Sequence, residues 1–229
     1  MTASERPSPN FDDRPPATPI DMLVLHYTGM ESAEAALDRL CDPGGPGADK
    51  VSAHYVIDED GTVVSLVAED KRAWHAGEAF WRGDADINGR SVGIELVNPG
   101  HEFGYRDFPD AQMAALQTLA KEILARHPIE ARNVVGHSDV APGRKTDPGE
   151  RFDWAGLAAA GIGLWPAECP PIDSGPDEAL NRLGEYGYGV SDPGAAVTAF
   201  HRHFFPENLD GPAGPESLGL LKGLLDLCG

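Results

Sequence analysis

Cysteine is scarce in this chain, and no cysteine has the spacing of a metal or redox motif. The three cysteines, Cys41, Cys169 and Cys228, cannot all pair within one chain. None of them lies in a C-x-x-C arrangement. Free thiols in a reducing compartment are therefore expected.

Long apolar runs are also lacking. Residues 1–20 contain no apolar run of the roughly seven or more residues that a secretory signal requires. No later segment approaches the roughly 20 apolar residues of a membrane-spanning helix. The sequence therefore predicts a cytoplasmic protein without a membrane span. If a leader had been removed, the protein would instead be periplasmic or belong to the cell envelope.

Basic side chains are outnumbered by acidic ones. The chain has 18 Lys and Arg against 37 Asp and Glu, a formal net charge of -19. Nucleic acid is bound mainly through Lys and Arg that neutralise its phosphates. Nucleic acid is therefore not expected as a partner. The sequence does not indicate the oligomeric state.

The overall composition is typical of an ordinary globular protein. The apolar share is 41% of 229 residues, enough for one catalytic domain and a small appendage. Short apolar runs typical of strands alternate with helical patterns between residues 20 and 165. This alternation predicts an α/β fold with a central mixed β-sheet flanked by helices. Strands are expected at 22–25, 51–57, 62–67, 91–97 and 133–136, and helices at 31–40 and 110–127, the latter capped by Asp110.

Composition divides the chain into segments. Three short helical patterns, at 177–183 before Gly184, at 195–205 and at 215–227, predict a small all-α C-terminal domain. A unit of that size is marginally stable alone, so it is expected either to pack on the main domain or to be only just self-sufficient. The predicted layout is an extended Pro-rich arm over 1–19 with order beginning at Ile20, a catalytic domain over 20–166, a Pro-rich linker over 167–176, and the three-helix domain over 177–229.

Two histidines and one aspartate have the pattern of metal ligands. His26 ends the first strand, while His137 and Asp147 lie in the Gly- and Pro-rich loop after the last strand. Two imidazoles and a carboxylate suit Zn²⁺ and leave a fourth position open for water. The sequence therefore predicts one catalytic zinc ion per chain. Each histidine taken singly is also compatible with a hydrogen-bonded surface residue.

Two further charged residues are candidates for the chemistry. Glu95 interrupts an otherwise apolar strand, and a buried carboxylate is costly unless it is paired or put to use. It is predicted to carry a proton during catalysis, with a structural ion pair as the alternative. Lys145, two residues before Asp147, is either an oxyanion stabiliser or a surface charge.

Five segments carry a family resemblance, in the expected order between about Ile20 and Trp165. The segments LHYTG, VSAHYVIDEDGTV, RAWHAG, SVGIELVN and GHSDVAPGRKTDPG resemble those of zinc-dependent N-acetylmuramoyl-L-alanine amidases. This family is related to phage amidase-type lysozymes and to peptidoglycan recognition proteins. The resemblance implies the same sheet-and-helix fold, zinc on His26, His137 and Asp147, Glu95 as catalytic acid/base, and Lys145 beside the developing oxyanion.

The resemblance also implies substrate contacts. Trp74, His75 and Asn88 match positions that line the substrate groove, although Trp74 is equally compatible with the core. His54 either supports the metal site or packs on the sheet.

The C-terminal helices are similar to small peptidoglycan-binding modules, although any three-helix domain would share their pattern. His201 and His203 are two residues apart on a predicted helix, so their side chains diverge and cannot share one ion.

The expected activity is hydrolysis of the amide between the lactyl group of N-acetylmuramic acid and L-alanine. The expected partners are peptidoglycan fragments or the murein polymer, and the sequence does not decide between them or name the third stem residue. Two alternatives stand beside this function. One is a non-catalytic muropeptide-binding protein, and the other is a different zinc metallohydrolase.

Overall fold

A six-stranded mixed sheet forms the centre of the protein in the computed structural model, which describes residues 3–45, 47, 49–167, 169–173 and 175–229. The strands of the described chain are β1 (Ser4–Glu5), β2 (Phe11–Asp13), β3 (Met22–Tyr27), β4 (Tyr55–Ile57), β5 (Val63–Ser65), β6 (Lys71–Ala73), β7 (Ser91–Leu96) and β8 (Val134–Gly136). The sheet order is β1-β5-β4-β7-β3-β8, and β2 pairs separately with β6. Strands β4, β7, β3 and β8 are parallel, whereas β5 is antiparallel to β4.

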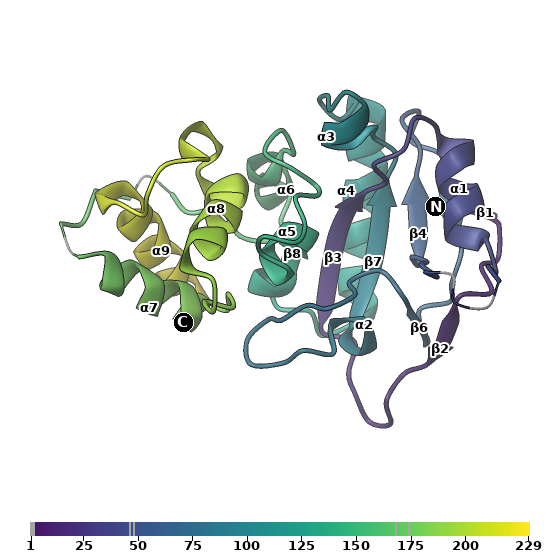
Figure 1. The fold of residues 1–229 in the computed structure, drawn as a ribbon, viewed down its shortest axis with the longest axis horizontal. Coiled ribbons are helices and arrows are strands. Elements are labelled where there is room, and N and C mark those ends of the chain that lie inside the picture. The colour runs from purple at the N-terminus through teal and green to yellow at the C-terminus, as the bar shows by residue number, and fades with distance from the viewer. Residues whose placement is uncertain (1–2, 46, 48, 168, 174) are drawn as a thin grey trace.

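Helices flank this sheet, as the sequence predicts (Figure 1). The α-helices of the described chain are α1 (Ala33–Cys41), α2 (Ile87–Arg90), α3 (Gly100–Phe103), α4 (Asp110–Arg126), α5 (His137–Val140), α6 (Trp154–Ala159), α7 (Pro176–Tyr186), α8 (Pro193–Phe204) and α9 (Pro215–Cys228). The predicted α/β architecture with a C-terminal group of helices is confirmed. No helix in the described ranges has the length and apolar character needed to cross a membrane.

The two faces of β3 are directed to different cores. Leu23 and Leu25 pack with the apolar side of α4, which lies behind the sheet in Figure 1. Met22 and Val24 belong instead to the core on the opposite face. Because side chains alternate along a strand, His26 continues the Met22 and Val24 set and faces away from α4.

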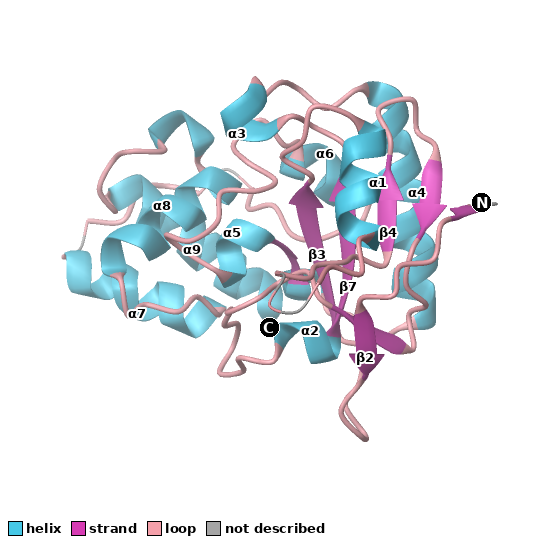
Figure 2. Cartoon of the chain, turned by 45° about the vertical axis from the view of Figure 1, so that its right-hand side comes forward, coloured by secondary structure: helices cyan, strands magenta, loops and turns pink. Residues whose placement is uncertain are grey.

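The C-terminal helices share that second core with the sheet. Trp81 and Met22, both fully buried, pack in one cluster with Tyr186, Tyr188 and Phe200. Figure 2 shows α7, α8 and α9 as one lobe beside α5 and the strands. The three helices are therefore packed on the main domain, as expected for so small a unit. The linker boundaries stay a prediction, and residues 168 and 174 of that segment lie outside the described residues.

Two helix ends differ from the sequence prediction. Asp110 was expected to cap α4, but it is the first helical residue and Pro109 holds the cap position. The acidic side chain stabilises the first turn there through the helix dipole. Helix α7 was expected to close at Gly184, but it continues to Tyr186 and ends at Gly187, whose φ of 142° suits glycine. Burial of Tyr186 accounts for the extra turn.

The prediction that order begins at Ile20 is wrong. Within the described part of the arm, which excludes residues 1 and 2, β1 adds a parallel strand beside β5, and β2 pairs with β6. The buried side chains of Ser8 and Asn10 replace the apolar anchors that sequence patterns detect. Ser8 donates to the Leu40 carbonyl, and the Asn10 amide donates to the Asp42 and Val51 carbonyls.

Arg14 fixes the end of the arm to the sheet. Its guanidinium donates to the backbone carbonyls of Glu69, Asn88, Gly89 and Ser91 at 2.8–3.2 Å. Burial lowers the pKa of Arg14 to about 10, a value at which the side chain is still charged at neutral pH. A cation held by four carbonyls is a stabilising contact that an apolar side chain cannot replace.

We predict that Arg14→Leu lowers the free energy of unfolding by about 2–4 kcal/mol, because several partly buried carbonyls lose their donor. Urea denaturation followed by circular dichroism measures the change. Arg6→Leu is the matched control, since Arg6 lies on the same arm and pairs with the exposed Glu34 and Asp38. An effect of Arg14→Leu no larger than that of Arg6→Leu would contradict the prediction.

Candidate metal centre and active site

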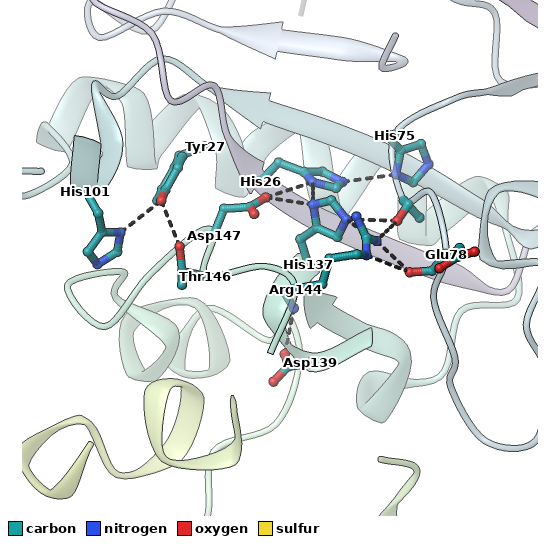
Figure 3. A network of polar contacts seen from close by, with 12 residues as sticks. His26, Tyr27, His75, Glu78, His101, His137, Asp139, Arg144, Thr146 and Asp147 are labelled. Carbon is teal, nitrogen blue, oxygen red and sulfur yellow. Dashed lines mark hydrogen bonds and ion pairs between the residues drawn. The ribbon is translucent and has the colours of Figure 1, made fainter. Parts of the chain in front are cut away.

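Three side chains predicted as metal ligands converge at the carboxyl ends of the strands. His26 lies near the end of β3, His137 opens α5 directly after β8, and Asp147 lies in the following loop (Figure 3). The His26 and His137 Nδ1 atoms are 2.9 Å apart, and each lies 3.0 Å from Asp147 Oδ2. All three side chains are buried.

Hydrogen bonds fix which nitrogen of His137 faces this cluster. Its Nε2 lies 3.0 Å from the Ala76 carbonyl oxygen, which can only accept. Nε2 therefore carries a ring proton and donates it to this carbonyl, and Nδ1 is the nitrogen that faces Asp147.

A longer chain of hydrogen bonds fixes which nitrogen of His26 faces the cluster. The Ser91 hydroxyl donates to the Ile87 carbonyl at 2.6 Å and so accepts from His75 Nε2 at 3.1 Å. His75 Nδ1 is then an acceptor, and His26 Nε2 donates to it at 3.0 Å. His26 is left with a lone pair on Nδ1. A side chain at Gly93 would prevent this arrangement, because its Cβ would lie 2.5 Å from the His75 ring.

The protonation states of the cluster match those of a metal site. Burial and the neighbouring His137 lower the pKa of His26 to about 4. Burial alone would raise the pKa of Asp147, but His137 and His26 outweigh it and the pKa falls below its usual range. The hydrogen bonds described above leave the Nδ1 atoms of both histidines facing the Asp147 carboxylate oxygen. A cation can be bound by all three atoms, so the donor set fits a divalent metal.

Glu95 is the register partner of His26 on the neighbouring strand β7. The two residues therefore point to the same face of the sheet. Its Oε2 atom is buried and has no hydrogen-bond partner among the described residues. Burial first, and then the charge of Asp147, raise the pKa of Glu95 well above its usual value, while Lys145 opposes the shift. Such a carboxyl group can hold a proton that an exposed glutamate would release.

A cavity of about 380 Å³ opens onto these groups. Its wall includes His75, Glu95, His137, Lys145 and Asp147, and the helix α1 side contributes Arg39 and Leu40. The structure thus brings together the residues predicted for metal binding, proton transfer and oxyanion stabilisation.

The residues predicted to bind substrate occupy different positions. His75 lines the cavity, but Asn88, Trp74 and His54 are not among its lining residues. Asn88 Oδ1 accepts from the backbone N–H groups of His75 and Ala76, at 3.1 and 2.8 Å, and so holds the loop that carries His75. Trp74 donates from its indole to Asp12 on the arm.

His54 lies one step further from the ligands. Its Nδ1 accepts from the Gly93 N–H, and its Nε2 lies 3.1 Å from the Lys71 carbonyl oxygen and 3.0 Å from the Arg14 guanidinium. Burial, and then the charge of Arg14, lower the pKa of His54 to about 3. Its ring packs edge-on against His75, which places it beside the hydrogen-bond chain and not among the ligands.

Two residues of the site were missed by the sequence analysis. Arg144 lines the cavity and donates to the Ala76 and Glu78 carbonyls, and its only sequence signal is its position beside Lys145. Ser91 completes the proton arrangement on His26, but a serine at the start of a strand carries no signal of that role.

An α/β fold that brings two histidines, an ionised aspartate and a glutamate with a raised pKa together beside one cavity has the parts of a metal-dependent hydrolase. The family model described as N-acetylmuramoyl-L-alanine amidase matches residues 16–150. The chain belongs to the N-acetylmuramoyl-L-alanine amidase family. The family and enzyme class predicted from the sequence are confirmed.

Relatives within this family cover the chain to different extents. N-acetylmuramoyl-L-alanine amidase AmiD of Escherichia coli is 35% identical over 92% of this chain and 84% of its own length. Its complex with anhydro-N-acetylmuramic acid-L-Ala-D-gamma-Glu-L-Lys superposes with a TM-score of 0.81 at 34% identity, covering 93% of this chain and 91% of that one. The 1,6-anhydro-N-acetylmuramyl-L-alanine amidase AmpD of Citrobacter freundii is 37% identical over 67% of this chain and 87% of its own length.

A third relative extends the comparison to another solved structure. AmpDh3 of Pseudomonas aeruginosa gives a TM-score of 0.79 at 33% identity, covering 93% of this chain and 94% of that one. Matches over 93% of this chain must extend well into residues 177–229. The C-terminal helices are therefore part of the fold shared with AmiD and AmpDh3.

We predict that Glu95→Gln stabilises the metal-free protein at pH 8. The raised pKa means that the folded state binds the Glu95 proton more tightly than the unfolded state does. The contribution of Glu95 to the free energy of unfolding is fully present below the pKa of this group in the unfolded state. It is lost as the pH rises through its pKa in the folded state. Urea denaturation at pH 5 and pH 8 should therefore show a stabilisation by Glu95→Gln that grows with pH. A difference independent of pH would contradict the raised pKa.

Proposed function

We propose that this protein hydrolyses the amide bond between the lactyl group of N-acetylmuramic acid and L-alanine in peptidoglycan fragments. The observation that carries the proposal is the placement of Glu95 and Lys145 on the wall of the cavity that His137 and Asp147 also line. Amide hydrolysis needs a proton carrier and a positive group near one carbonyl, and this cavity supplies both.

Soluble anhydro-muropeptides are the proposed substrates. AmiD has been solved with an anhydro-N-acetylmuramic acid tripeptide, and AmpDh3 with anhydromuramic pentapeptide. Both relatives share the fold over nearly the whole of this chain. We extend their ligand class to this protein on that basis.

Zinc is the proposed metal, held by His26 Nδ1, His137 Nδ1 and an Asp147 carboxylate oxygen, one ion per chain. Two imidazoles and a carboxylate are a common catalytic zinc set. When bound in such a set, zinc polarises a carbonyl group and lowers the pKa of a coordinated water to about 7.

The protein's own groups complete the chemistry. Glu95 takes a proton from the attacking water and delivers it to the departing L-alanine nitrogen, and its raised pKa lets it hold that proton between the two events. Lys145 is one of the residues that line the cavity, and its side chain stabilises negative charge as it develops on the carbonyl oxygen. The hydrogen-bond chain through His75 and Ser91 keeps His26 in the binding tautomer throughout.

Product analysis tests this function. The protein is incubated with a soluble anhydro-muropeptide, and the products are separated and identified by mass spectrometry. The expected products are a free lactyl carboxylate and a peptide with a new L-alanine amine. Binding without cleavage would identify a non-catalytic muropeptide-binding protein, and cleavage at another bond would identify a different metallohydrolase.

We predict about one equivalent of zinc per chain in protein purified without added metal, because the ligands are preformed by rigid elements. Elemental analysis measures the content. Chelation should abolish amidase activity, and added Zn²⁺ should restore it. Activity that survives complete removal of zinc would contradict the proposed metal.

We predict that Glu95→Gln retains zinc but lowers turnover of the anhydro-muropeptide by about 10²–10⁴-fold, the usual effect of losing a positioned proton carrier. Lys145→Ala should lower turnover by roughly 10²–10³-fold through loss of oxyanion stabilisation. Steady-state kinetics with measured zinc content separates the two effects from metal loss. Near-normal turnover of Glu95→Gln would show that another group transfers the proton.

A further inference from the structure

A fully buried carboxylate lies two residues beyond the ligand His137. Asp139 belongs to α5, and its Oδ2 accepts from the backbone N–H of Gly136 at 2.7 Å. Figure 3 shows Asp139 below the ligand cluster. This hydrogen bond closes the turn that carries His137, because it links Gly136, immediately before His137, to Asp139, two residues after it.

The other donors to Asp139 come from the C-terminal segment. The Tyr188 hydroxyl donates to Oδ1 at 2.7 Å, and His203 Nδ1 donates to Oδ2 at 2.7 Å. Tyr188 follows α7, and His203 lies on α8; both are buried. Burial, and then the charge of Asp139, raise the pKa of Tyr188 well above its usual value, so the hydroxyl keeps its proton. A buried carboxylate without such donors is strongly destabilised.

Close packing surrounds the same turn. A Cβ atom on Gly136 would lie 2.7 Å from Pro148, which follows the ligand Asp147, and 3.2 Å from Trp154. The Trp154 ring in turn stacks on His203 with the centroids 3.7 Å apart. The chain segments that carry two of the ligands therefore meet the C-terminal helix α8 at one point.

We propose that Tyr188 and His203 are positioning residues for the metal centre. They hold Asp139, Asp139 holds the turn at Gly136, and that turn sets the direction of His137. By this inference, the segment 177–229 helps to position a ligand of the metal site. The inference rests on the proposed function for the identity of the metal and on hydrogen-bond geometry for the mechanism.

Zinc affinity of the full-length protein tests the proposal. The variants are Tyr188→Phe, His203→Leu and the double variant, and the dissociation constant is measured by competition with a chromogenic chelator. We expect the double variant to bind zinc about 10–100-fold more weakly, the range seen when groups that orient metal ligands are removed.

Two variants serve as controls. Tyr186→Phe makes the same change in the same core, and the hydrogen-bond partners found for Asp139 in the described chain do not include Tyr186. His203→Asn keeps an N–H donor near the Nδ1 position. Tyr186→Phe should bind zinc like the unmodified protein, and His203→Asn should recover most of the affinity lost in His203→Leu.

A purely structural role would give a different result. The double variant would then lower the melting temperature of the metal-free protein while its zinc dissociation constant stayed unchanged, and this outcome would overturn the proposal. If the unmodified protein binds no zinc, the proposed function fails and amide hydrogen exchange decides the inference separately. Faster exchange at residues 137–140 in the double variant than in Tyr186→Phe supports positioning, and equal exchange overturns it.

Discussion

The structure depends on the placement of three lone pairs against one another. His26 Nδ1, His137 Nδ1 and Asp147 Oδ2 lie about 3 Å apart, and the ring protons that could relieve their repulsion are bonded elsewhere. One proton is held by the Ala76 carbonyl and the other by the chain through His75 and Ser91. These hydrogen bonds therefore leave three donor atoms in an arrangement that fits a cation. Much of the surrounding architecture, including Gly93 under His75 and Asn88 behind the loop, keeps those two protons in place.

The sequence could predict the sheet because its strands are apolar and its turns contain Gly, Pro and Asp at informative positions. It could also indicate candidate side chains that the fold brings together, since His26 ends one buried strand, Glu95 interrupts another, and Asp147 lies in the loop after the last strand. Hydrophobic patterns could not predict the docked arm, because Arg14, Ser8 and Asn10 hold it with polar contacts to backbone carbonyls. Such contacts depend on which carbonyls the fold leaves free.

The residues that support the site could not be predicted from the sequence for a related reason. Ser91 and Arg144 act on groups that are distant in the chain, and a single serine or arginine has no pattern of its own. Asn88 and Trp74 could be placed in a groove only by resemblance, and in the structure both make contacts outside the lining of the cavity. Residue type thus indicated the side chains that we propose to react better than it indicated the residues that hold them, because the holding contacts depend on the fold.

The core shared by the sheet and the C-terminal helices limits how this protein can be recombined with others. Trp81 is fully buried among residues from both sides, and Tyr188 crosses to a carboxylate of the catalytic part. A chimera joined within the Pro-rich segment would leave these two side chains facing an unmatched surface. A chimera must therefore take the C-terminal helices and the Trp81 loop from the same parent protein. Natural or engineered recombination would transfer the two segments together.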